Sequence, residues 1–284
     1  MPANVERFIA KAHTRGADGY ILDLEDSVPP QEKASARDNI QETAKRVSQN
    51  GADVLVRINR PLELAVADIQ ATVSYNVHAL LLPKLMGPEH VRLLAELVDK
   101  REAELDMEQG WTRFVAMVET AEAFLVMDRI AAAHPRIAAI EIGGEDFAMS
   151  LGMRPGPETL RHSKEHSIIA ARAAGVMPMG LMGTVADYQD LEAARASARS
   201  ARESGIEGAS CIHPSIVPVL NEEFSPAPEE VASAKRVVEA YRKAEAAGRG
   251  SIQVDGKMVD VPVVERALHL LKRHERISTR QTGS

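Results

Sequence analysis

The 284-residue sequence contains a single cysteine, Cys211, and no run of basic residues. One cysteine cannot form an internal disulfide framework, or a thiolate cluster that binds zinc or iron within one chain. Acidic residues outnumber basic ones, and the formal net charge is -7. These features exclude a disulfide scaffold and argue against nucleic acid as a partner.

Long apolar segments and targeting signals are also missing. No stretch approaches the roughly 18 consecutive apolar residues of a transmembrane helix, so no membrane partner is expected. Residues 1–6 lack the basic and apolar regions of a signal peptide. We therefore expect a cytoplasmic protein.

Apolar runs that favour β-strands alternate with helical patterns through most of the chain. Seven such runs recur at intervals of roughly 30 residues, which is the length of a βα repeat. They are centred on Tyr20, Val54, Leu80, Phe114, Ile140, Met177 and Cys211. A glycine-rich nucleotide loop of the G-x-G-x-x-G or G-x-x-x-x-G-K type is absent, which disfavours the alternative α/β fold, a doubly wound open sheet.

The repeat predicts an α/β protein whose residues 1–222 form a catalytic (β/α)8 TIM barrel. A closed barrel needs eight strands, one more than the apolar runs supply. The missing strand should precede the helix that begins at Val5, where only residues 1–4 are available. We therefore predict a truncated first strand.

Residues 223–284 lie outside the barrel repeat and are predicted to form a C-terminal extension. The pattern indicates a long helix over residues 222–246, a β-hairpin over 252–260 with Asp255-Gly256 as its turn, and a helix over 263–276. Because the barrel repeat has no position for these elements, we expect them to pack on a neighbouring subunit.

Two acidic motifs suggest a metal site. Glu119 follows the fourth apolar run, and Asp146 ends the motif Gly143-Gly144-Glu145-Asp146 after the fifth. Their separation matches a strand plus a crossover helix, so both carboxylates should lie at the same end of neighbouring parallel strands. Mg²⁺ is often held by one or two carboxylates together with substrate and water. The alternative role is capping of the following helices.

Charged residues also follow the first two apolar runs. Asp23, Glu25 and Asp26 close the first run, where they could cap a helix or belong to a site. Arg57 lies near the end of the second run and needs an acceptor, because an unpaired buried charge is costly. It is predicted either to pair with Asp23 or Glu25 or to clamp a substrate carboxylate. The sequence leaves both roles open.

Seven motifs occur in an order that resembles a known superfamily. They are Asp18–Pro30, Val56–Asn59, Leu82–Lys84, Val118–Thr120, Gly143–Asp146, Ile212–Pro214 and Asp255–Glu265. Together they resemble the HpcH/HpaI aldolase and citrate lyase superfamily, in its citrate lyase beta-subunit-like branch, which includes malyl-CoA and citramalyl-CoA lyases. The resemblance covers nearly the whole chain.

The resemblance implies a (β/α)8 barrel, Mg²⁺ as cofactor and a homotrimer or homohexamer. It also implies cleavage or formation of a malyl-CoA, citramalyl-CoA or citryl-CoA type 3-hydroxyacyl-CoA, with acetyl- or acyl-CoA and a 2-keto acid as small-molecule partners. By motif, Glu119 and Asp146 are the expected metal ligands. Arg57 is expected to bind the keto acid during catalysis. Asp260 is expected to reach an adjacent subunit's site and act on the acetyl-CoA methyl carbon.

Further contacts are expected from the same resemblance. Gly144 and Glu145 should bind substrate, and Lys33 and Arg37 are the candidates for coenzyme A. Lys84 should support the metal ligands rather than form a Schiff base, which Mg²⁺ chemistry does not require.

The chain departs from the superfamily pattern at two places that concern the coenzyme A phosphates. Residues 1–4 lack a basic first strand, and Gly208-Ala209 stands where many relatives carry Gly-Lys. Nearby, His213 is expected to be a hydrogen-bonded structural residue and Cys211 to pack in the core.

Two other functions stay open at this level. One is a class II aldolase of the same superfamily that acts on free hydroxy-keto acids without coenzyme A. The other is a non-catalytic paralogue that binds acyl-CoA, which the truncated first strand prompts.

Overall fold

The computed structural model describes residues 1–184 and 188–282. The chain divides into two compact units, Met1–Asn221 and Glu222–Ser284. Residues 283–284, which end the predicted extension, lie outside the described part. No helix within the described residues combines the length and apolarity needed to cross a membrane.

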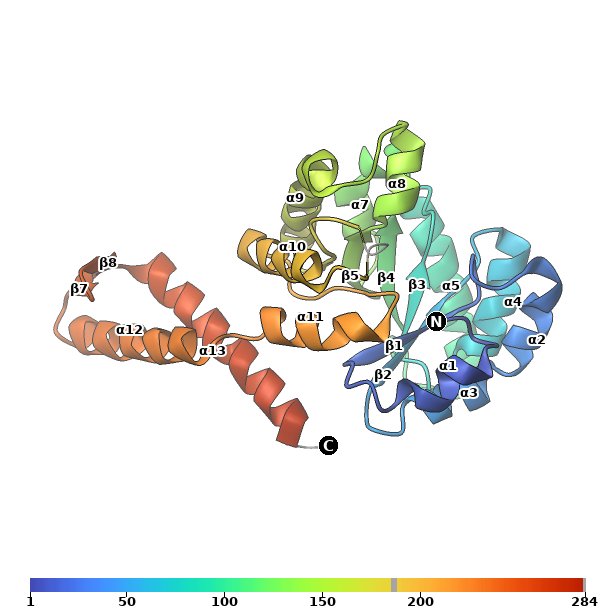
Figure 1. Cartoon of the computed structure of the whole chain (residues 1–284), viewed down its shortest axis with the longest axis horizontal. Coiled ribbons are helices and arrows are strands. Elements are labelled where there is room, and N and C mark those ends of the chain that lie inside the picture. The colour runs from blue at the N-terminus through green and yellow to red at the C-terminus, as the bar shows by residue number, and fades with distance from the viewer. Residues whose placement is uncertain (185–187, 283–284) are drawn as a thin grey trace. The chain divides into compact units, whose positions relative to one another are not determined.

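The first unit is built on a sheet of six parallel strands that neighbour one another in chain order (Figure 1). The strands are β1 Gly19–Asp23, β2 Asp53–Arg57, β3 Ala79–Leu82, β4 Arg113–Val118, β5 Ile137–Ile142 and β6 Met177–Met179. Each strand is short and mostly apolar, as expected for strands covered by helices outside and by packed side chains inside.

Single bridges extend the sheet at both edges. Pro2 pairs in parallel with Asp23 of β1, and Met179 of β6 pairs in parallel with Gly208. These bridges supply the first and last positions of a (β/α)8 TIM barrel, so the predicted fold class is confirmed. At the position of the predicted truncated first strand, the structure has only the single Pro2 bridge to β1.

The prediction of a strand around Cys211 is wrong, because only Gly208, just before it, forms a bridge to the sheet. Ala209 to His213 forms no strand, and His213 instead caps the 3-10 helix η2, Pro214–Ile216. The side chain of Ser210 bonds to Glu141 on β5, so this segment is held by side-chain contacts rather than by a strand ladder.

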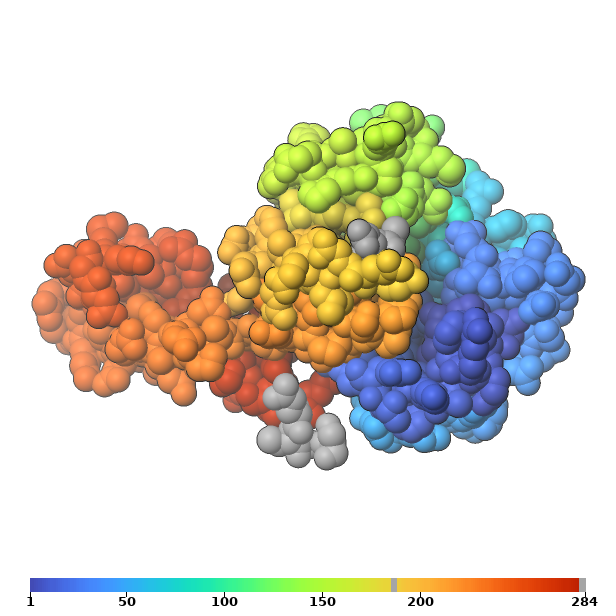
Figure 2. Space-filling model, in the orientation of Figure 1, coloured from blue at the N-terminus to red at the C-terminus, as the bar shows by residue number. Residues whose placement is uncertain are grey.

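Helices cover the outside of the sheet (Figure 1). They are α1 Glu6–Ala12, α2 Lys33–Asp38, α3 Ile40–Val47, α4 Leu62–Thr72, α5 Pro88–Glu104, α6 Ala121–Phe124, α7 Met127–Ala131, α8 Gly144–Leu151, α9 Pro157–Ala174, α10 Leu191–Ser204 and α11 Val217–Phe224, with a 3-10 helix η1 at Pro30–Glu32. Figure 2 shows the same face in a space-filling view, in which the strands of Figure 1 are largely covered. The apolar side chains between strands and helices form the main core.

A second, smaller apolar layer fills the inside of the barrel. Leu81, Val115 and Ala139 are buried there, and Met117 and Met179 pack against them. Because these residues come from neighbouring strands, they form the packed interior that a barrel of this size requires.

The Glu222–Ser284 unit has its own apolar core, formed by two helices and a β-hairpin. Helices α12 Pro228–Ala246 and α13 Val261–Thr282 pack against each other, and β7 Ile252–Val254 pairs antiparallel with β8 Lys257–Val259. The hairpin turn is Asp255-Gly256, both with positive φ, as the Asp-Gly pair predicts. The predicted single helix over 222–246 is wrong, because the Ser225-Pro226-Ala227-Pro228 segment separates α11 from α12.

Candidate metal and substrate site

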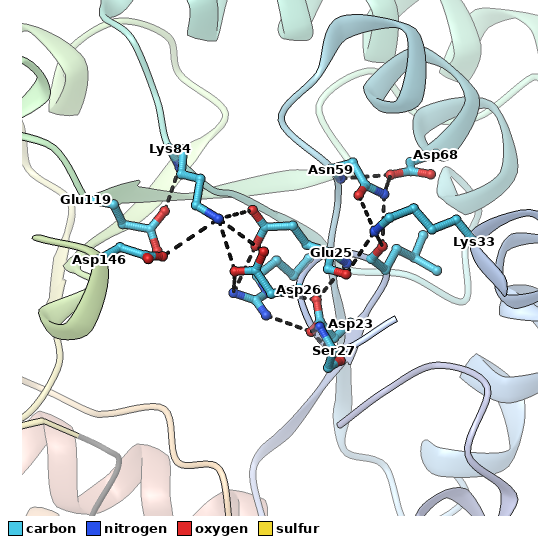
Figure 3. Close-up of polar contacts among 12 residues, drawn as sticks. Asp23, Glu25, Asp26, Ser27, Lys33, Asn59, Asp68, Lys84, Glu119 and Asp146 are labelled. Carbon is cyan, nitrogen blue, oxygen red and sulfur yellow. Dashed lines mark hydrogen bonds and ion pairs between the residues drawn. The ribbon is translucent and has the colours of Figure 1, made fainter. Parts of the chain in front are cut away.

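Charged side chains gather at the carboxyl ends of β1 to β5 (Figure 3). Asp23 ends β1 and stands in register with Arg57, which ends β2. Glu119 directly follows β4, and Asp146 lies in the first turn of α8 after β5. Active sites of TIM barrels form at this edge, so the charged residues occupy the expected position.

Glu119 and Asp146 lie side by side, as their spacing predicts (Figure 3). Glu119 is only 2% exposed, and its Oε2 accepts a 2.6 Å hydrogen bond from the backbone N–H of Lys84. Burial, together with the negative charges of Glu25 and Asp146, raises the pKa of Glu119 to about 7. The Asp146 side chain is more open to solvent, at 30% exposure.

Gly143 makes room for the Glu119 carboxylate. A Cβ atom at residue 143 would lie 2.5 Å from Oε1 and 2.6 Å from Cγ of Glu119. A larger residue would therefore displace Glu119, so the absence of a side chain on Gly143 is a requirement of the site.

Lys84 connects the acidic residues. Its Nζ lies 2.8 Å from Oε1 of Glu25, 3.0 Å from Oδ2 of Asp26 and 3.8 Å from Oδ2 of Asp146. Burial alone would lower the pKa of Lys84, but the hydrogen bonds to Glu25 and Asp26 outweigh burial and raise it. Lys84 therefore remains an ammonium at neutral pH, a state unsuited to Schiff-base formation.

Arg57 forms the ion pair that the sequence left open. Its Nε and Nη2 donate to Oδ1 and Oδ2 of Asp23 at 2.7 Å and 2.6 Å, and its Nη1 lies 2.9 Å from Oε2 of Glu25. Burial opposes ionisation of Asp23, but Arg57 outweighs burial and lowers the pKa of Asp23 to about 2. A guanidinium has five N–H donors, so hydrogen bonding to Asp23 leaves donors for a substrate carboxylate.

Lys33 and Arg37 are engaged behind the charged cluster. The Lys33 ammonium donates to the carbonyls of Leu24 and Glu25 and to Oδ1 of Asn59, which accounts for its three N–H donors. Arg37 donates from Nε to Oδ1 of the buried Asp68 at 2.8 Å. These contacts join α2 to the segments after β1 and β2 and to α4. A role toward coenzyme A stays a prediction.

The remaining predicted residues divide between the two units. Gly144 and Glu145 open α8 beside Asp146, with the Glu145 side chain exposed. Asp260 belongs to the Glu222–Ser284 unit, where it precedes α13 and its Oδ1 accepts a 3.4 Å hydrogen bond from the N–H of Val263.

The paired carboxylates fit a hard divalent cation. Among the described residues no group of three or more histidine, cysteine, aspartate or glutamate side chains is arranged to hold a metal ion. Mg²⁺ needs fewer protein ligands, because water and substrate complete its shell. Burial raises the pKa of Glu119, and the charges of Glu25 and Asp146 add to the rise; a divalent cation at the pair would favour the carboxylate and so oppose both effects.

Sequence reasoning missed another buried acid, Glu141 of β5. It is 5% exposed, and the hydroxyl of Ser210 lies 3.0 Å and 3.2 Å from its two carboxylate oxygens. Burial raises the pKa of Glu141, whereas the charge of Lys164 and the Ser210 hydrogen bond oppose this rise. A single acid inside the apolar run Ile137–Ile142 was the available signal, of the same kind that identified Arg57.

Lys164 of α9 is buried near Glu141. Its Nζ donates to the carbonyl oxygens of Leu181 and Gly183, the second at 2.6 Å. Burial lowers the pKa of Lys164 to about 8. The Lys164 ammonium thus holds the segment that follows β6 through two hydrogen bonds. This segment lies beside Gly144, in the first turn of α8.

His213 and Cys211 lie after the Gly208 bridge. Nδ1 of His213 is 2.7 Å from the Ser215 hydroxyl, and its ring stacks on Tyr188 with 4.5 Å between centroids. His213 is thus hydrogen-bonded as expected. Cys211 is half-buried rather than fully packed in the core.

Comparison with known proteins agrees with the motifs. Residues 1–214 match the family described as HpcH/HpaI aldolase/citrate lyase. A (3S)-malyl-CoA thioesterase of Cereibacter sphaeroides is 33% identical over 281 residues, which cover 98% of this chain and 94% of that protein. Citrate lyase subunit beta of Leuconostoc mesenteroides subsp. cremoris is 30% identical over 275 residues, which cover 96% of this chain and 90% of that protein.

A solved structure extends the similarity to the fold. Protein CitE from Mycobacterium tuberculosis, in complex with magnesium, acetoacetate and coenzyme A, aligns with a TM-score of 0.76 and 30% sequence identity. The alignment covers 97% of this chain and 96% of that chain. The likeness therefore includes both compact units rather than the barrel alone.

Proposed function

The chain belongs to the HpcH/HpaI aldolase and citrate lyase family, and on that basis we propose that it is a Mg²⁺-dependent carbon–carbon lyase. Its substrate is a 3-hydroxyacyl-CoA of the malyl-CoA, citramalyl-CoA or citryl-CoA type, which it cleaves to acetyl- or acyl-CoA and a 2-keto acid, or forms from them. The observation that carries the proposal is the convergence of Glu119 and Asp146 at the carboxyl edge of the barrel.

Glu119 and Asp146 would hold the metal ion. Both offer oxygen ligands, and Gly143 and the Lys84 N–H fix the orientation of Glu119. When bound there, Mg²⁺ supplies a Lewis acid for the oxygens of the keto acid and for charge that develops on them during cleavage. The neighbour CitE was crystallised with magnesium, acetoacetate and coenzyme A, which supports this assignment.

Arg57 would bind the carboxylate of the keto acid. Its side chain is 21% exposed, and the contacts with Asp23 and Glu25 use only part of its five N–H donors. The fixed orientation would let Arg57 meet a planar carboxylate without rearrangement. Gly144 and Glu145, which share a turn with Asp146, would complete the contact with substrate.

Asp260 would move the proton at carbon. Cleavage leaves an enolate of the acyl-CoA, and that carbon must gain a proton, which is removed again in condensation. We assign this role to Asp260 of a neighbouring copy in a homotrimer or homohexamer. Lys33 and Arg37 are the proposed contacts to coenzyme A, and for Lys33 this requires that coenzyme A replace one of its three present acceptors.

Thioester hydrolysis is a second candidate activity. It is favoured by the malyl-CoA thioesterase that is 33% identical over 98% of this chain. Hydrolysis would consume the same substrate but release malate or a related hydroxy acid instead of a keto acid. Product analysis therefore separates the two activities.

The test is a set of assays with malyl-CoA, citramalyl-CoA, citryl-CoA and a free hydroxy-keto acid, with and without a chelator. We expect chelator-sensitive release of a 2-keto acid, and loss of that release in Glu119→Gln but not in Glu122→Gln, an exposed control three residues away. Folded protein that releases no keto acid from any substrate would contradict a lyase. Free hydroxy acid as the sole product would identify a thioesterase, and cleavage of free hydroxy-keto acids alone would identify an aldolase. Binding of acyl-CoA without turnover would indicate the non-catalytic paralogue.

A further inference from the structure

Lys164 of α9 is a buried cation that the proposed mechanism does not use. Its side chain belongs to a residue that is only 5% exposed. Within the described residues its ammonium forms no direct ion pair with a carboxylate, and Glu141 attracts it only from beyond ion-pair distance. Burying a charge in this way is costly unless hydrogen bonds compensate for the lost water. The hydrogen bonds of Lys164 therefore indicate which part of the protein its burial serves.

Both hydrogen bonds go to residues 181–184, the β6 segment, which directly follows β6 and its Gly180 turn. The ammonium donates to the carbonyl oxygens of Leu181 and Gly183, the second at 2.6 Å. From the other side, the N–H of Gly183 donates to Oγ of Ser197 on α10 at 3.0 Å. Backbone groups of a buried segment need such partners. Loss of the ammonium would remove the donor from both carbonyls and free the β6 segment to shift.

The β6 segment packs against Gly144, the first residue of α8. A Cβ at residue 144 would lie 3.7 Å from Cγ2 of Thr184 and 3.9 Å from the carbonyl oxygen of Gly183. It would also lie 3.1 Å from Cδ1 of Leu160 on α9. Leu160 and Lys164 are four residues apart and so share one face of α9. This face supports the start of α8 twice, directly through Leu160 and through the β6 segment that Lys164 holds.

The position of Asp146 depends on the start of α8. Asp146 lies two residues after Gly144, in the first turn of that helix. Among the described residues, its carboxylate has a single polar contact, 3.8 Å from Nζ of Lys84. Glu119, in contrast, accepts a hydrogen bond from the Lys84 N–H and fills the space beside Gly143. Asp146 is therefore placed by the backbone of its own turn and by what packs against that turn.

We propose that Lys164 is a positioning residue of the candidate metal site. By holding the β6 segment against Gly144, it keeps Asp146 where a cation shared with Glu119 can bind. This inference rests on the proposed function, because it concerns the metal pair of that reaction. Residues that orient a ligand without touching the metal change metal affinity by about 10- to 100-fold when they are replaced.

The charge of Lys164 and its hydrogen bonds have opposite effects on a bound cation. A positive charge near the site repels Mg²⁺, so loss of the charge alone would tighten Mg²⁺ binding. Loss of the hydrogen bonds would let the first turn of α8 move and would weaken Mg²⁺ binding. The sign of the change in affinity therefore distinguishes positioning from electrostatics.

The test is calorimetric titration with Mg²⁺, which requires no turnover. We expect Lys164→Met, which keeps an unbranched side chain but has no donor, to weaken Mg²⁺ affinity by about tenfold or more. Lys164→Arg, which restores cationic N–H donors, should recover part of the lost affinity. Lys100→Met removes the same charge from a side chain that is 73% exposed, and this control should bind Mg²⁺ as wild type does.

Thermal unfolding without Mg²⁺ reports the stability of each variant separately. A folded Lys164→Met protein with wild-type or higher Mg²⁺ affinity overturns the inference, whether or not the protein is destabilised. If Lys164→Met does not fold, Ser197→Ala decides, because it removes the acceptor of the Gly183 N–H in the same segment. Weaker Mg²⁺ binding in that variant supports the inference, and wild-type affinity overturns it.

The outcomes also separate this inference from the proposed function. The expected loss of Mg²⁺ affinity in Lys164→Met, together with no lyase turnover by wild type, supports the positioning role and contradicts the lyase. Lyase turnover with an unchanged Mg²⁺ affinity in Lys164→Met overturns the positioning role alone. Folded wild-type protein that binds no Mg²⁺ overturns both.

Discussion

The backbone N–H of Lys84 donates to Oε2 of Glu119, and the Lys84 backbone is left-handed, with a φ of 48°. For a residue with a Cβ this conformation is strained, and the surrounding structure has to stabilise it. The lysine side chain contributes to that stabilisation by bonding to Glu25 and Asp26. One residue therefore orients the candidate metal ligand with its backbone and neutralises the acids beside it with its side chain.

Replacing Lys84 by methionine should lower the free energy of unfolding by about 1–3 kcal/mol, because the buried Glu25 loses its charged hydrogen-bond donor. Glu25 is 5% exposed, and its Oε1 accepts from Lys84 at 2.8 Å. Denaturant unfolding measures the change. Lys100→Met, whose side chain is 73% exposed, is the control and should stay within about 0.5 kcal/mol of wild type. Equal effects of the two substitutions would contradict a role for the Lys84 charge.

Alanine at residue 143 should weaken Mg²⁺ binding by about tenfold or more, because the new Cβ would displace the Glu119 carboxylate. The clash is direct, at 2.5 Å from Oε1. Gly208→Ala is the matched control, because a Cβ at Gly208 meets no atom within 4 Å. Calorimetric titration with Mg²⁺ measures both variants. Wild-type affinity in Gly143→Ala would exclude Glu119 as a ligand in its observed position.

The Asp23–Arg57 pair should stabilise the protein in a pH-dependent manner. The pKa of Asp23 is lowered from 3.8 to about 2, so its contribution is fully present above pH 4 and disappears as the pH falls toward 2. The shift corresponds to about 2 kcal/mol. Denaturant unfolding of wild type and Asp23→Asn between pH 6 and pH 3 should therefore give a difference that shrinks with acidification. A difference that is constant over this range would contradict the ion pair as its source.

The convergence of Glu119 and Asp146 could be predicted because it follows from periodicity. Parallel strands joined by crossover helices bring all carboxyl ends to one edge, whatever the details of the helices. The charge of Arg57 inside an apolar run likewise required a partner, and Asp23 and Glu25 were the nearest acids at that edge.

Other features of the site have no local signal. The left-handed backbone of Lys84 follows a proline and depends on contacts with distant acids, so the sequence Leu82-Pro83-Lys84 does not reveal it. Ser210 bonds to Glu141 across 69 positions in the chain, and a loss of strand structure at Ala209 to His213 accompanies that contact. Side-chain bonds between distant segments decide these details, whereas apolar periodicity decides the barrel.

Replacing Asp260 by asparagine should reduce kcat for acyl-CoA cleavage by about 10²- to 10⁴-fold while Mg²⁺ affinity stays at the wild-type value, because a proton-transfer group is lost and no metal ligand is touched. Asp255→Asn in the nearby hairpin turn is the control, since asparagine also tolerates the left-handed backbone of that position. Steady-state kinetics and calorimetry give the two readouts. If Asp260 acts in the site of a neighbouring copy, two inactive variants should complement each other. Mixing Asp260→Asn with Glu119→Gln protein should restore part of the activity after subunit exchange, because some sites then combine an intact Glu119 with an intact Asp260. Full acyl-CoA cleavage by Asp260→Asn alone would contradict Asp260 as the proton-transfer group.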